Sequence, residues 1–247
     1  QPGGSLASSD EIQAYKRLAE LLYETEVPPT EILANLQLWM PRSALSRTLF
    51  MYEIYTKQIH THGQIFEFGV RWGQNLALLT TLRSILEPHN VTRRVIGFDT
   101  FSGFPSISSQ DGNATAVARG AMNVAPEYDK SLTDLLTVHE NLAPRANVKK
   151  FELVKGDVCE TLPVWLEAHP ETLISMAYFD LDLYEPTKMC LELIQPYLSE
   201  NSILAFDELA SEEFPGETRA LREAFGSKGY KIIRSPISTY QSYAILT

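Results

Sequence analysis

From Gln64 onward, short apolar runs of strand character alternate with segments of helical periodicity. Five such runs precede helices, and two more, residues 230–235 and 240–247, close the chain. Strands that alternate with helices predict a mostly parallel sheet with helices on both faces. The core runs are largely apolar without alternation, as expected of strands that are buried on both faces. We therefore expect an α/β, doubly wound, seven-stranded sheet whose C-terminal strands form an antiparallel pair.

Two segments lie outside this alternation. Residues 1–62 have helical periodicity and begin with a capping-box pattern from Ser8 to Glu11. We expect them to form an N-terminal helical extension that serves as a lid and as the contact of a homo-oligomer. Residues 106–147 are polar and irregular apart from one helical piece, as is typical of a substrate-binding insert. The remaining chain, residues 63–247, is the expected catalytic domain.

Each of the five expected parallel strands ends in an acidic residue. Ligands of such sheets bind beyond the carboxyl ends of the strands. A single aspartate there often caps the following helix, but five acidic strand ends on one edge indicate a site. The acidic strand ends are Glu67, Asp99, Asp157, Asp180 with Asp182, and Asp207 with Glu208.

The first three strand ends suit a nucleoside-containing cofactor. Gly69 and Gly73 allow the backbone to approach a ligand closely before a helix begins, although a structural turn would look similar. Asp99 is placed to accept hydrogen bonds from two ribose hydroxyls, and Asp157 is placed near an adenine amino group. The alternatives are a turn-forming role for Asp99 and a helix cap for Asp157.

The last two strands end in Asp180, Asp182, Asp207 and Glu208. Carboxylates cannot share a small dry space while all of them are ionised. A hard divalent cation resolves the repulsion, and an all-oxygen ligand set suits Mg²⁺, Ca²⁺ or Mn²⁺. A cap of the helix near Pro186 explains Glu185, but it does not explain the acids of the next strand.

Six motifs in order resemble those of class I S-adenosylmethionine-dependent methyltransferases, specifically the macrocin O-methyltransferase family. They read "EFGV", "DTFSGFP", "GDVCETLP", "DLDLYEPT", "FDEL" and "PGETRA", and the resemblance covers roughly residues 60–247. It implies a Rossmann-like fold, S-adenosylmethionine and Mg²⁺ as cofactors, and a bacterial enzyme that methylates sugar hydroxyls during antibiotic biosynthesis. The acceptor would be a small-molecule glycoside or a nucleotide sugar.

The resemblance also implies residue roles. Asp182 would be the general base, and the metal would be bound by Asp180, Asp207 and Glu208. The cofactor would be bound by Glu67, Gly69, Val70, Arg71, Gly73, Asn75, Asp99, Thr100, Phe101, Ser102, Gly156, Asp157 and Asp180.

Two departures from the family pattern bear on these roles. Glu208 stands where the family has a second aspartate, so the ligand geometry or the metal could differ. The family order Val-Trp-Arg-Gly is here Val-Arg-Trp-Gly, so Arg71 cannot simply inherit the arginine's role. Among the histidines, only His139 in the insert is a candidate for substrate contact.

The chemistry leaves two alternatives open. A catechol-like phenol could chelate the metal as a vicinal sugar diol does, so a phenol O-methyltransferase is possible. The Asp180-x-Asp182 pair also resembles the nucleophile and acid/base of haloacid-dehalogenase-type phosphatases. In those enzymes the motif ends the first strand, whereas three expected strands precede it here.

Composition limits the partners. The formal net charge of −10 argues against nucleic acid and anionic membranes as partners. No apolar run reaches the roughly 18 residues of a membrane span, and no signal peptide is visible. The two cysteines, Cys159 and Cys190, are too few for a disulfide framework. We therefore expect a cytoplasmic protein.

Overall fold

The computed structural model describes residues 7–112, 118–226, 229–238 and 240–247. The chain divides into two compact units, residues 1–49 and 50–247. The described part of the first unit contains α1 (Ser9–Tyr23), α2 (Pro29–Ala34), the 3₁₀ helix η1 (Leu36–Trp39) and the start of α3 (Arg42–Gln58). The predicted capping box is present, because Ser8 and Glu11 bond each other's backbone N–H groups.

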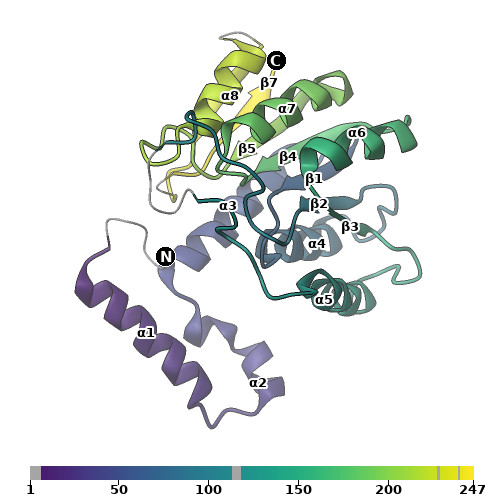
Figure 1. Ribbon diagram of the computed structural model, residues 1–247. Coiled ribbons are helices and arrows are strands. Elements are labelled where there is room, and N and C mark those ends of the chain that lie inside the picture. The colour runs from purple at the N-terminus through teal and green to yellow at the C-terminus, as the bar shows by residue number, and fades with distance from the viewer. Residues whose placement is uncertain (1–6, 113–117, 227–228, 239) are drawn as a thin grey trace. The chain divides into compact units, whose positions relative to one another are not determined.

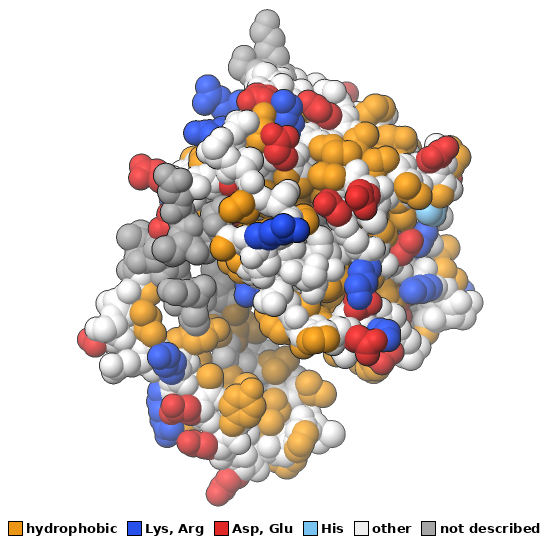
Figure 2. Space-filling model, viewed as in Figure 1, with side chains coloured by type: hydrophobic (Ala, Val, Ile, Leu, Met, Phe, Trp, Pro, Cys, Tyr) orange, Lys and Arg blue, Asp and Glu red, His pale blue; other side chains and the backbone are white. Residues whose placement is uncertain are grey.

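The first unit lacks a core of its own within its described residues. None of the residues in α1, α2 and η1 is buried. Hydrophobic side chains lie exposed over these helices in Figure 2, and Tyr23, Leu33 and Leu38 are 90%, 72% and 65% exposed. Burial of apolar surface is the main source of stability, so the helices of this unit gain little from one another.

The second unit is built on a seven-stranded sheet of order β3-β2-β1-β4-β5-β7-β6 (Figure 1). Strands β1 to β5 pair in parallel, β7 pairs antiparallel with both β5 and β6, and the predicted sheet is thereby confirmed. The strands are β1 (Gln64–Phe68), β2 (Val95–Asp99), β3 (Phe151–Lys155), β4 (Ile174–Phe179), β5 (Leu198–Phe206), β6 (Tyr230–Arg234) and β7 (Ser242–Leu246).

Helices cover both faces of the sheet. One hydrophobic core joins the sheet to α6 (Val158–Ala168), α7 (Tyr184–Ile194) and α8 (Gly216–Phe225). The other joins it to the second half of α3, to α4 (Gln74–Leu86) and to α5 (Tyr128–Leu142). A second 3₁₀ helix, η2 (Gln195–Tyr197), follows α7. The central strand β4 is buried at every position, as its apolar run predicts.

The insert between β2 and α5 begins with a hairpin-like return. Phe104 accepts a backbone hydrogen bond from Gly120 and donates one to Ala121. Residues 113–117 of the expected substrate insert lie outside the described residues. The predicted divisions at 62/63 and 106–147 stay predictions.

Candidate active site

The carboxyl ends of the central strands meet at one edge of the sheet. Backbone hydrogen bonds run from Gly69 N–H to Phe98 O (3.0 Å), from Asp180 N–H to Phe68 O (2.8 Å) and from Asp207 N–H to Phe179 O (3.0 Å). The parallel ladder therefore extends one residue beyond β1, β4 and β5. It places Asp180 and Asp207 at the same edge as the first loop, as the sequence predicts.

Asp99 binds the backbone of the two loops next to it. Its Oδ2 accepts the N–H groups of Val70 and Arg71, each at 2.7 Å, and its Oδ1 accepts that of Phe101 at 2.5 Å. Arg71 and Phe101 both have positive φ angles, 49° and 56°. Bonds from amides to a carboxylate are strong, so Asp99 stabilises these uncommon backbone conformations and shapes the loops around it.

The loop after β1 has the features of a ligand cradle. Gly69 has φ 89°, and a side chain there would start 1.9 Å from the carbonyl oxygen of Asp180. Gly73 has φ 80° and precedes α4. Asn75 is 3% exposed, and its Oδ1 has no hydrogen-bond partner. A buried amide oxygen without a donor is costly, so a bound ligand that supplies a donor fits this loop. Glu67, the last but one residue of β1, is fully buried.

The other predicted cofactor residues lie around the ends of β2 and β3. Thr100 Oγ1 donates to Gly103 O and accepts the Ser102 N–H, so both residues stabilise the turn. Gly156 N–H donates to Asp99 O at 2.9 Å. Asp157 caps α6, because its Oδ1 accepts the Cys159 N–H at 2.9 Å. The helix-cap alternative therefore holds for this oxygen, and the adenine contact stays a prediction.

Asp182 occupies an unusual position just beyond β4. Its φ is 60°, and its side chain is 9% exposed. Burial, and to a smaller extent the nearby Asp207 carboxylate, raise the pKa of Asp182 to about 7, although Arg71 acts in the opposite direction. A carboxyl group with a pKa near 7 is well matched to proton transfer at neutral pH.

Asp207 is oriented by residues that the sequence did not reveal. Its Oδ1 accepts hydrogen bonds from Tyr178 Oη (2.6 Å) and Gln241 Nε2 (2.7 Å). Gln241 also donates to Tyr178 Oη at 3.2 Å. Gln241, directly before β7, thus contributes to the site, which no local motif indicates.

Glu217 is a further acid that the sequence analysis missed. It lies in the first turn of α8, is fully buried, and accepts the Glu208 N–H through Oε2 at 3.2 Å. Its Oε1 has no hydrogen-bond partner. Burial raises its pKa well above the ordinary range, and the charges of Asp182 and Asp207 add to the effect. In the sequence, "PGET" reads only as a helix start with an acid in its first turn.

The predicted metal ligands do not form a ready-made ion site. The donor chemistry is all-oxygen, which suits a hard cation. Among the residues that the structure describes, however, no three His, Cys, Asp or Glu side chains are grouped so that they could hold a metal ion. Asp207 also has one oxygen engaged by Tyr178 and Gln241.

One residue predicted to contact the substrate, His139, lies in α5. His139 precedes Glu140, which binds the backbone N–H of Lys150 just before β3 starts. This contact places the end of α5 near the start of β3, and the contact of His139 with substrate stays a prediction.

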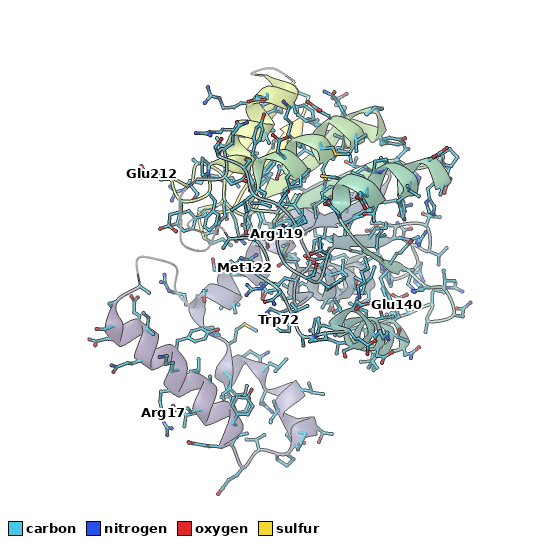
Figure 3. All side chains as sticks on the ribbon, viewed as in Figure 1. Arg17, Trp72, Arg119, Met122, Glu140 and Glu212 are labelled. Atoms are coloured by element: carbon cyan, nitrogen blue, oxygen red, sulfur yellow. The ribbon has the colours of Figure 1, made fainter. Side chains whose placement is uncertain are left out.

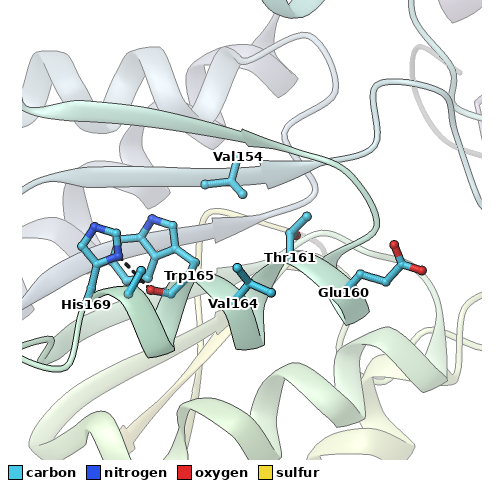
Figure 4. Close-up of a pocket in the computed structure, with 7 residues that line it drawn as sticks. Val154, Glu160, Thr161, Val164, Trp165 and His169 are labelled. Carbon is cyan, nitrogen blue, oxygen red and sulfur yellow. Dashed lines mark hydrogen bonds between the residues drawn. The ribbon is translucent and has the colours of Figure 1, made fainter.

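A hollow of about 330 Å³ between β3 and α6 is lined by Val154, Val164 and the stacked rings of Trp165 and His169 (Figure 4). None of the predicted site residues lines it.

Comparison with solved structures identifies the family. No protein-family model matches the sequence, and a search of curated proteins found no match. A structure described as CalS11, calicheamicin methyltransferase, aligns with a TM-score of 0.94 and 39% identity over 97% of this chain and 93% of that chain. The chain belongs to the family of class I S-adenosylmethionine-dependent O-methyltransferases that includes CalS11. The resemblance inferred from the six motifs is thereby confirmed.

Two further solved structures align with this chain. An apo structure described as CalS11, TDP-rhamnose 3'-O-methyltransferase, aligns with a TM-score of 0.85 and 36% identity over 97% and 95% of the two chains. The O-methyltransferase NovP shares the fold, with a TM-score of 0.62 and 20% identity over 82% and 80%. The chain is thus a methyltransferase and not a phosphatase. In its described residues, no helix is long and apolar enough to cross a membrane.

Proposed function

We propose that this enzyme methylates a sugar hydroxyl of a nucleotide sugar or natural-product glycoside, with Asp182 as the general base. The observation that carries the proposal is the position of Asp182, a buried carboxyl group beside Asp207 at the same strand edge as the Asp99 cradle. The similarity to CalS11 supports a sugar acceptor, because that protein is described as a TDP-rhamnose 3'-O-methyltransferase.

Different residues would bind S-adenosylmethionine and activate the acceptor hydroxyl. The loops held by Asp99, together with Glu67 and Asn75, would bind S-adenosylmethionine. When bound, S-adenosylmethionine would supply an electrophilic methyl group: an acceptor oxygen that attacks the methyl carbon in line would break its C–S bond and release S-adenosylhomocysteine. Asp182 would take the hydroxyl proton as the oxygen–carbon bond forms, and fixed alignment of the reacting groups lowers the barrier. Asp157 and Gly156 would lie beside the adenine.

We also propose that a divalent cation binds to the acids after β4 and β5. Asp180, Asp207 and Glu208 would bind Mg²⁺, or Ca²⁺ or Mn²⁺, if their side chains converge on the ion. A bound cation would position vicinal hydroxyls and lower their pKa. Calorimetry with MgCl₂ tests this directly: binding that disappears in Asp207→Asn supports the site, and the absence of any binding contradicts it.

The function is tested with a panel of acceptors. The enzyme is incubated with S-adenosylmethionine and TDP-linked deoxysugars, finished glycosides or catechols, and mass spectrometry detects a methyl-sized mass gain. Methylated sugars support the proposal. Methylated catechols alone would favour the phenol alternative. Without S-adenosylmethionine binding in calorimetry, the assignment of the cradle would be wrong.

A homo-oligomer formed through the N-terminal helices is also proposed. The exposed apolar side chains of α1 and α2 support it, because such surface is normally covered. Sedimentation velocity checks this, and a monomer at micromolar concentration would contradict it.

A further inference from the structure

Asp182 has a backbone conformation that the chain must hold in place. A non-glycine residue with φ near 60° is disfavoured by about 1 kcal/mol or more, and it persists only where the surroundings fix it. Two residues later α7 begins, and its N-cap Leu183 provides no side-chain hydrogen bond. The segment that carries the proposed base therefore depends on support from elsewhere in the fold.

One support comes from α8. Gly216 packs directly against the segment: a Cβ atom on it would lie 2.7 Å from Tyr184 N and 3.1 Å from Asp182 O. This contact fixes one side of the segment, and it leaves no room for a side chain at position 216.

The second support comes from the insert, at Asp111. This residue is 1% exposed, and its Oδ1 accepts the Tyr184 N–H at 2.6 Å. Its Oδ2 accepts the N–H of Ser108, so the same carboxylate fixes the turn in which it lies. Asp111 thus does for α7 what a capping side chain does for an ordinary helix, but from a position 73 residues away.

The residues on either side of Asp111 contact α8 and the loop that precedes it. Gly112 has φ 87°, and a Cβ atom on it would lie 2.8 Å from Glu213 O. Arg219 of α8 donates to Gln110 O at 3.3 Å. Residues 110–112 therefore contact both the segment after β4 and the segment after β5. Figure 3 marks the later part of the insert by Arg119 and Met122, and the loop after β1 by Trp72.

We propose that Asp111 is a positioning residue for methyl transfer: it anchors the insert to the Asp182–Tyr184 segment and keeps the proposed base aligned. The inference rests on the proposed function, because it takes Asp182 as the base. It predicts that Asp111 affects turnover and acceptor affinity but not cofactor affinity, since the Asp99 cradle is made by other residues.

The test compares Asp111→Ala with Asp111→Asn, which retains a carbonyl oxygen for the Tyr184 N–H. Misplacement of a catalytic group by about 1 Å can cost up to about 10²-fold, and we expect kcat of Asp111→Ala to fall by at least about tenfold. The KM for the acceptor should rise, while the Kd for S-adenosylmethionine changes by less than about twofold. Asp111→Asn should recover most of the lost turnover. The exposed Asp134→Ala is the matched control.

A readout independent of activity is hydrogen exchange at the Tyr184 amide. In Asp111→Ala this amide should exchange faster than in the wild type, while β4 keeps its protection. Unchanged kcat in Asp111→Ala would overturn the proposal, as would equal impairment of both variants. If Tyr184 exchange rises as expected but the wild type methylates no acceptor, the anchor stands and the proposed function fails.

Discussion

The two sides of the strand edge are stabilised in different ways. On the β1–β2 side, Asp99 is satisfied by three backbone N–H groups. On the β4–β5 side, Asp182 and Glu217 are buried near Asp207, and the pKa values of both are raised. The Asp99 carboxylate on the cofactor side is thus fully hydrogen-bonded, whereas the acceptor side holds buried carboxyl groups whose charges repel one another. Strain that persists in a folded protein is typical of sites where chemistry takes place.

The largest expected effect is on the acceptor side. Asp182→Asn removes the proposed proton acceptor but keeps the size of the side chain. General-base catalysis contributes about 10²–10⁴-fold, so kcat should fall by a factor in that range. Calorimetry should show an unchanged Kd for S-adenosylmethionine. Turnover above a tenth of the wild-type value would mean that another group accepts the proton.

A smaller effect is expected on the cofactor side. Asp99→Asn leaves a single oxygen to serve the N–H groups of Val70, Arg71 and Phe101. Hydrogen bonds to a charged group contribute about 1.5–3 kcal/mol, so S-adenosylmethionine should bind at least about tenfold more weakly in calorimetry. The exposed Asp134→Asn serves as the control. Equal affinity in the two variants would show that Asp99 does not shape the cradle.

The smallest effect concerns the stability of the acceptor side. Glu217→Gln removes a buried acid near Asp182 and Asp207, while its amide oxygen can still accept the Glu208 N–H. We expect the free energy of unfolding to increase by about 1 kcal/mol, which raises Tm by about 2–4 °C for a domain of this size. Thermal melts in metal-free buffer check this. A lower Tm for Glu217→Gln than for the wild type would show that the carboxyl group stabilises the fold.

The mostly parallel sheet with its antiparallel C-terminal pair, and the location of the edge, could be predicted from the sequence. Apolar runs such as residues 174–179 are explicit in the sequence, and the parallel arrangement follows from their alternation with helices. The acids at the strand ends therefore had to share one edge. Asp157 shows the limit of this reasoning, because a helix cap and a ligand contact require the same residue type at the same place.

The sequence by itself determined the fold class, the family and the edge at which Asp180, Asp182 and Asp207 lie. Those features follow from local periodicity and from short motifs. Only the tertiary structure decided which distant side chains contact this edge. Asp111 binds the Tyr184 N–H, Gln241 binds Asp207, and Glu217 lies near Asp182 and Asp207. Such pairings depend on how the insert, α8 and the last strands pack. A hydrogen bond or a buried charge between residues far apart in the chain has no local sequence pattern.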